Sequence, residues 1–111
     1  MPDSSKHDLL PGTLDMLVLQ TLSIGALHGY AIGQHIARLS GDVLRIEQGS
    51  LYPALDRLLR SGLIRSKWGT SPTGRRARYY SITASGRKQL GEEISAFDKT
   101  LTAIARVLGR A

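Results

Sequence analysis

The chain contains no cysteine, and this absence excludes several kinds of structural and metal site. A domain without thiols has no disulfide bonds, and it has no cysteine-ligated zinc or iron–sulfur centre. No apolar run approaches the roughly 18 residues that a membrane-spanning helix requires. Residues 1–8 are polar and lack the apolar core of a secretion signal. These absences predict a cytoplasmic protein with no membrane partner.

Residues of the kinds used for catalysis or metal binding are also sparse. His7, His28 and His35 do not share a helix face with carboxylates at metal-ligand spacing. No serine, histidine and acid form a recognisable nucleophile pattern. The segment from Gly69 to Arg75 has the glycine spacing of a phosphate-binding P-loop but lacks its lysine and hydroxyl residue. We therefore expect no enzyme activity, no metal site and no cofactor.

What the chain does have is a local excess of positive charge, on top of a net charge of +6. Residues 63–88 contain no acidic side chain and seven basic ones, namely Arg65, Lys67, Arg75, Arg76, Arg78, Arg87 and Lys88. Such a patch predicts a polyanionic partner, with nucleic acid ahead of an anionic membrane. The alternative is a solvated basic loop without a partner.

The length of 111 residues fits one domain whose core is modest, so a partner subunit would help to stabilise it. Residues 1–8 read as a flexible arm. Apolar periodicity predicts a first helix capped by Thr13, buried on two sides and ended by Gly25. A second helix follows His28 and stops at Gly41. Residues 43–46 are either a short strand or a connector.

A third helix is expected from Ser50 to Gly62. The Ser50 hydroxyl would cap it, and Pro53 would lie in the first turn, where its missing N–H costs nothing. Leucines at positions 51, 55, 58 and 59 form the buried stripe. Arg57 and Arg60 lie off that stripe and would face outward.

Two strands are expected next, from Leu63 to Trp68 and from Arg78 to Thr83, joined by a turn-rich loop at 69–74. This hairpin would carry Arg75, Arg76 and Arg78 at its tip and second strand. Trp68 and Tyr80 fit core or hairpin packing better than base stacking.

Thr83 is expected to cap a last helix that runs to about Leu108. Apolar residues recur along it at alternating spacings of four and three, namely Leu90, Ile94, Phe97, Leu101, Ile104 and Leu108. Such a heptad stripe covers the domain's own core, a partner chain, or both. We favour pairing with a second copy, which makes these six residues a candidate dimer interface.

The order of elements is three helices, a basic hairpin and a heptad helix, which is the plan of a winged helix-turn-helix. We thus predict a mainly α fold with a small β-hairpin, a DNA-binding domain at residues 9–83 and a dimerisation helix at 84–111. The third helix would enter the major groove of double-stranded DNA and the hairpin would contact its backbone. The candidate DNA-binding residues are Gln48, Ser50, Tyr52, Arg57, Lys67, Arg75, Arg76 and Arg78.

Each candidate has a structural alternative. Ser50 is at least a cap, and Tyr52 fits packing against a neighbouring helix as well as phosphate contact. Arg57 and Arg60 fit plain solvated surface. Because the chain has no asparagine, Gln48 would take over the adenine contact that asparagine often makes. A winged helix can also serve as a module that binds RNA or another protein.

Several segments, in this order, resemble the PadR family of transcriptional regulators. They are Pro11-Gly12-Thr13-Leu14, His28-Gly29-Tyr30, Gly49 to Leu58 with Gly62-Leu63-Ile64, and Arg78 to Gly86. The resemblance covers residues 9–110 and is closest to the short subgroup with a single C-terminal helix. It implies a homodimeric repressor on inverted-repeat operators, released by a small aromatic or hydrophobic effector. It marks Ser50, Tyr52 and the wing arginines as facing DNA.

Overall fold

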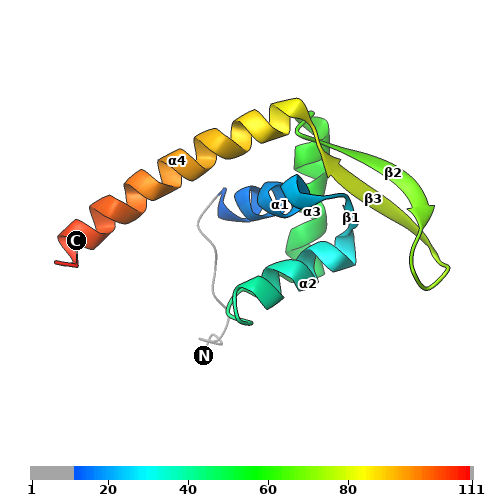
Figure 1. Cartoon of the computed structure of the whole chain (residues 1–111), viewed down its shortest axis with the longest axis horizontal. Coiled ribbons are helices and arrows are strands. Elements are labelled where there is room, and N and C mark those ends of the chain that lie inside the picture. Colours follow the sequence, from blue (N-terminus) through cyan, green and yellow to red (C-terminus); the bar gives the residue numbers. More distant parts are fainter. Residues whose placement is uncertain (1–11, 111) are drawn as a thin grey trace.

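The computed structural model describes residues 12–110. The order of elements is α1 (Thr13–Ile24), β1 (Leu27–His28), α2 (Gly29–Leu39), α3 (Gln48–Arg60), β2 (Ile64–Thr70), β3 (Arg76–Ile82) and α4 (Ala84–Val107). The first three helices pack together, the hairpin extends to one side and α4 runs away to the other (Figure 1). The predicted mainly α fold with a hairpin and a long last helix is confirmed. The expected arm at residues 1–8 lies outside the described residues.

α1 is the central element, and it contacts α2, α3, β3 and α4. It contributes Val18, Leu19 and Leu22 to the largest fully buried side chains, which are completed by Ile32 of α2 and by Leu51 and Leu55 of α3. The predicted burial of this helix on two sides is confirmed. Ile64 and Tyr80 of the hairpin and Leu90 of α4 also belong to the core, so both extensions are anchored in it.

The sheet is antiparallel and has the strand order β1–β3–β2. The sequence did not predict β1, because two residues show no periodicity. They pair with β3 through Leu27 opposite Tyr80 and His28 opposite Tyr79. The hairpin strands extend farther toward the tip than predicted, because the ladder continues to Thr70 opposite Arg76. Residues 43–46 form a connector and no strand.

Two predicted helix starts are wrong. Gly12, with a φ of 85°, occupies the N-cap position of α1 and provides no side-chain cap. Thr13 is the first residue of the helix and is not the cap. α3 begins at Gln48, and the carbonyl of Glu47 accepts the N–H groups of Ser50 and Leu51 at 3.0 and 2.9 Å. Ser50 therefore lies inside the first turn. Pro53 lies beyond that turn, where it removes one intrahelical hydrogen bond.

The end of α3 and the start of α4 meet at one joint. Gly62, with a φ of 73°, ends α3, while the N–H of Leu63 donates to the carbonyl of Leu58. The hydroxyl of Thr83 donates to the carbonyl of Gly62 at 2.8 Å and accepts the N–H of Gly86 at 3.0 Å. The predicted cap at Thr83 is confirmed, and one hydroxyl thus ties the two helices together.

Gly86 brings α4 close to the hairpin at this joint. A Cβ atom at this position would collide with the carbonyl oxygen of Leu63 and would lie 2.7 Å from Cγ1 of Ile82. Only glycine allows this approach without a shift of backbone. The joint is therefore packed as well as hydrogen-bonded.

Candidate nucleic-acid interface

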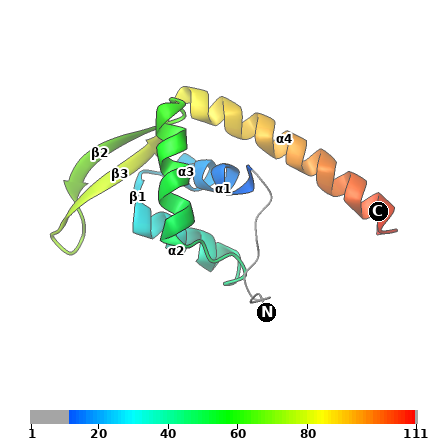
Figure 2. The same cartoon turned by 180° about the vertical axis from the view of Figure 1, so that it is seen from behind.

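The start of α3 is open to solvent. Gln48, Gly49 and Ser50 are all exposed, while Leu51, Ala54, Leu55 and Leu58 bury the opposite face against the core. Figure 2 shows α3 in front of α1, which crosses behind it, with no other described element over α3. A helix N-terminus carries partial positive charge and free N–H groups, which favour a phosphate or a base acceptor. The predicted positions of Gln48 and Ser50 suit a helix that enters a groove.

Tyr52 combines the two roles that the sequence left open. Its side chain is 44% exposed. Its hydroxyl and ring edge also lie so close to Gly29, at the start of α2, that a Cβ atom there would be 2.8 Å from Oη. The contact fixes the ring on α2 and leaves the rest of it in solvent. Tyr52 therefore packs and remains accessible to a ligand.

The register of the hairpin divides its cations between two faces. Directly opposite residues of an antiparallel pair share a face, and successive residues alternate. Trp68, Arg76 and Arg78 therefore share the face of the buried Tyr80. Lys67 pairs with Tyr79 and lies on the other face. The side of the hairpin that begins in the core thus continues outward as an arginine and tryptophan surface, and Lys67 is not part of it.

The three predicted wing arginines are all exposed, but their surroundings differ. No described residue contacts the guanidinium of Arg75 at the turn. The guanidinium carbon of Arg76 lies 4.5 Å from the centre of the Trp68 ring. Nε of Arg78 donates to Oγ of Ser66 at 2.9 Å, and its guanidinium lies over Tyr80. Trp68 is 57% exposed, so it lies outside the core, and its ring contacts Arg76 on the hairpin.

Tyr80 links the hairpin to α3. Burial raises the pKa of Tyr80 above its ordinary value of 10.0, and the neighbouring Arg78 opposes this shift. The electrostatic influence of Tyr52 and Asp56 on the same hydroxyl also raises its pKa, which brings two residues of α3 to its surroundings. α3 also contacts β2 directly, so the hairpin lies beside this helix. The phenol remains neutral at physiological pH.

The two arginines of α3 are exposed, as predicted, and both are paired. Arg57 donates to Asp15 of α1 at 2.9 Å, and its side chain is 55% exposed. Arg60 donates to Asp56, one turn earlier, at 2.6 Å. The sequence missed the first pair because its partners are 42 positions apart. A phosphate contact by Arg57 would require it to share or leave Asp15.

The structure divides the predicted dimer stripe of α4. Leu90 belongs to the chain's own core, and Phe97 is partly buried against it. Ile94, Leu101, Ile104 and Leu108 are exposed, and Leu101 retains 48% of its accessible surface. Because Leu90 has little surface left for a partner, its assignment to the interface is corrected. Val107, which was not predicted, is 87% exposed beside the stripe.

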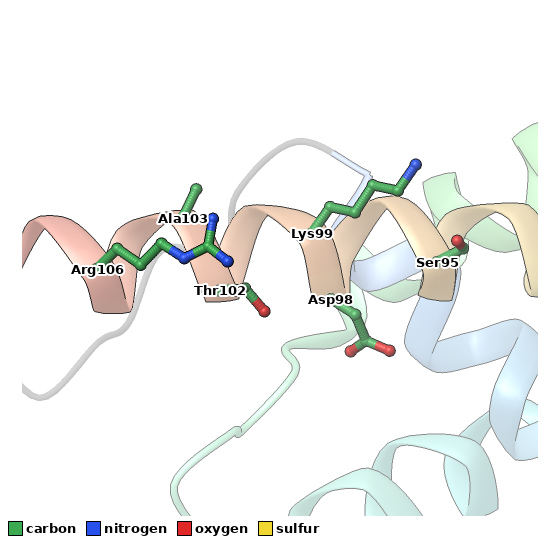
Figure 3. A pocket seen from close by; sticks show the side chains of 6 residues that line it. All are labelled: Ser95, Asp98, Lys99, Thr102, Ala103 and Arg106. Atoms are coloured by element: carbon green, nitrogen blue, oxygen red, sulfur yellow. The ribbon is translucent and has the colours of Figure 1, made fainter. Parts of the chain in front are cut away.

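A shallow depression runs along another face of α4. It is lined by Ser95, Asp98, Lys99, Thr102, Ala103 and Arg106, which project from successive turns of the one helix (Figure 3). It is open to solvent and formed by one helix alone, whereas pockets for small aromatic ligands enclose most of the ligand surface. This depression therefore does not match the expected effector. Within residues 12–110, no helix is long and apolar enough to cross a membrane, and no group of three His, Asp or Glu side chains could hold a metal ion.

The three packed helices, the basic hairpin and the exposed start of α3 define a winged helix of the kind found in DNA-binding regulators. The chain also matches the model of the transcriptional regulator PadR-like family over residues 18–92. It belongs to that family. The resemblance seen in the sequence is thereby confirmed.

Solved structures support the same assignment. A transcriptional regulator from Clostridium thermocellum is 29% identical, with a TM-score of 0.79, over 86% of this chain and 92% of that one. A PadR family transcriptional regulator from Eggerthella lenta is 30% identical, with a TM-score of 0.76, over 90% and 85%.

Sequence relatives of unassigned function are also similar to this chain. Uncharacterized protein X of Lysinibacillus sphaericus is 29% identical over 78% of this chain and 80% of that protein. An uncharacterized 37.1 kDa protein in transposon TN4556 of Streptomyces fradiae is 40% identical over 86% of this chain, which spans only 24% of that protein. Comparable domains therefore also occur within longer proteins.

Proposed function

We propose that this protein is a sequence-specific DNA-binding transcriptional repressor that acts in the cytoplasm, as a homodimer on an inverted-repeat operator. The observation that carries the proposal is the adjacency of two surfaces. α3 packs against β2, and Tyr80, where the arginine face of the hairpin begins, lies within electrostatic reach of Tyr52 and Asp56 on α3. A major-groove helix beside a cationic hairpin can contact base edges and the flanking backbone of one duplex together.

Within this proposal, the start of α3 reads the bases. Gln48 can bind adenine through its amide, and Ser50 can bond to several bases. Tyr52 is held by Gly29 at the border of the groove. Arg75, Arg76 and Arg78 supply the contacts to phosphates, which give affinity without sequence preference. Lys67, on the other face of the hairpin, would contribute less than these arginines.

The dimer would form through the exposed aliphatic residues of α4. Ile94, Leu101, Ile104 and Leu108 follow heptad spacing and remain 37% to 62% exposed. Pairing two copies along this seam would remove these side chains from water and would place two α3 helices on two half-sites. An effector of hydrophobic or aromatic character would bind near the paired helices, since the hollow on one α4 is too open to enclose it.

A binding selection from genomic fragments, run with the purified protein at two salt concentrations, tests this function. We expect recovery of an inverted repeat whose half-site centres are about one helical turn, or a multiple of it, apart. Repression is then tested by placing that repeat upstream of a reporter gene. Recovery of unspecific DNA that salt removes completely would contradict operator reading and would favour the RNA- or protein-binding module.

A further inference from the structure

Trp68 occupies an unusual place for the single tryptophan of the chain. It lies in the outer half of β2, its side chain is 57% exposed, and the core does not need it. Large aromatic side chains contribute most when they are buried, so an exposed one calls for another explanation. Its only ring contact among the described residues is the guanidinium of Arg76, 4.5 Å from the ring centre.

The geometry of this pair leaves the arginine free to bind. Trp68 is opposite Arg78, and Arg76 is opposite Thr70, so Trp68 and Arg76 are diagonal neighbours on one face. A guanidinium donates its hydrogen bonds in the plane of the group. The aromatic ring instead attracts the positive charge and uses none of these donors. No described residue accepts a hydrogen bond from the Arg76 side chain. Arg78 differs, because its Nε is already bound to Ser66.

Immobilising such a side chain before the ligand arrives favours binding. A free arginine loses considerable rotamer entropy when a ligand fixes it. An arginine that already rests on an aromatic ring has lost part of that entropy beforehand. Its cationic character is retained, because the stacking interaction neutralises no charge.

We propose that Trp68 is a positioning residue that orients Arg76 for contact with a DNA phosphate. This inference rests on the proposed function and extends it, because it assigns the exposed tryptophan to the DNA surface through its neighbour. Of the hairpin arginines, Arg76 is then the one that is held on a ring while its hydrogen-bond donors stay free of other described residues. Replacing either partner removes the same advantage, so the two losses are not additive.

The test is a double-mutant cycle with Trp68→Leu, Arg76→Ala and the double variant. Binding is measured by fluorescence anisotropy on a labelled mixed-sequence duplex of about 30 base pairs at about 50 mM salt. We expect Trp68→Leu to weaken binding about two- to fivefold, as an exposed cation–π contact allows. Arg76→Ala should weaken it further, and the double variant should bind like Arg76→Ala alone.

A second pair of variants keeps the test independent of hairpin stability. Arg76→Lys retains the charge without the planar group, so it should weaken binding in the wild-type background and not in Trp68→Leu. Trp68→Phe retains a ring and should recover most of the lost affinity. Thermal unfolding without DNA should leave all of these variants close to wild type, because both side chains are exposed.

Each outcome decides between the inference and the function on which it rests. Wild-type affinity in Trp68→Leu, or losses that add in the double variant, would overturn the positioning role while DNA binding stands. Absence of salt-dependent binding by the wild-type protein would overturn both. The emission of Trp68 gives a further readout: it should change when duplex is added, and an unchanged spectrum would place the duplex away from this ring.

Discussion

The hairpin and α4 are the two extensions that leave the helical core, and they expose opposite chemistry. The outer hairpin carries cations whose ring and hydroxyl neighbours come from its own strands. The outer half of α4 carries aliphatic side chains that nothing in the described chain covers. Exposed charged groups are well hydrated, but exposed apolar surface costs about 25 cal/mol of free energy per Å² relative to buried apolar surface. The hairpin surface is therefore stable in water without a partner, whereas burial of the apolar face of α4 against a partner would be favourable.

The largest effect that this comparison predicts is the loss of the proposed dimer. Leu101→Asp would place a carboxylate in the seam, and its burial without a partner should raise the dimer dissociation constant by about a hundredfold or more. Sedimentation at micromolar concentration should show monomers that keep their helical circular dichroism, because Leu101 lies beyond the core. Thr102→Asp adds the same charge on the polar face and should remain dimeric. A dimeric Leu101→Asp variant would mean that the apolar stripe is not the interface.

The next effect concerns the hairpin. Replacement of Arg75, Arg76 and Arg78 by alanine should weaken binding to every duplex by roughly ten- to a hundredfold near 0.1 M salt, and it should flatten the salt slope by up to ~0.9 for each lost phosphate contact. The matched control replaces Lys99, Arg106 and Arg110 of the C-terminal region, which removes the same charge. An equal loss in both variants would show that only net charge matters and that the hairpin has no special role.

A smaller effect tests the joint between the two extensions. Gly86→Ala should lower the free energy of unfolding by about 1–3 kcal/mol, because the added methyl group meets the carbonyl of Leu63. Gly91→Ala on the same helix meets nothing within 4 Å, and it should stabilise the protein by about 1 kcal/mol at most. Denaturant unfolding measures both changes. Equal behaviour of the two variants would mean that the close approach at Gly86 carries no strain.

The smallest effect concerns the ion pair between α1 and α3. Asp15→Asn should cost less than about 1 kcal/mol of stability, because Arg57 is half exposed and the pair is screened by solvent. The same change frees Arg57, so affinity for DNA should rise by about twofold or stay level. Asp98→Asn, which removes a carboxylate from α4, is the control. A clear fall in affinity would show that Arg57 acts on DNA only while Asp15 holds it.

The parts of the fold that could be predicted from the sequence are those with a local signal. Helical periodicity, glycine stops and the heptad stripe predicted the order of elements, and a run of basic residues suggested the role that we propose for the hairpin. The starts of α1 and α3 could not be predicted, because the residues that precede them, Gly12 and Glu47, form no side-chain cap.

The missed features of the candidate site depend on contacts between distant residues. Asp15 reaches Arg57 only after α1 and α3 have packed. The separation of Lys67 from the arginine face depends on the register of the strands. The seating of Tyr52 on Gly29 depends on how α3 meets α2. Composition and spacing predicted which segments form helices and strands, but they contain no information on which side chains meet.

The Thr83 joint has a consequence for the length scale of recognition. It joins the end of α3 to the start of α4, so a change in the tilt of α4 would change the orientation of α3. A helix of 24 residues is about 36 Å long. A pivot of about 5° over that length moves its end by about 3 Å, close to one base-pair step of DNA. In the proposed dimer, the packing of the two α4 helices would therefore set the spacing between the half-sites, while α3 would recognise the base sequence within each half-site.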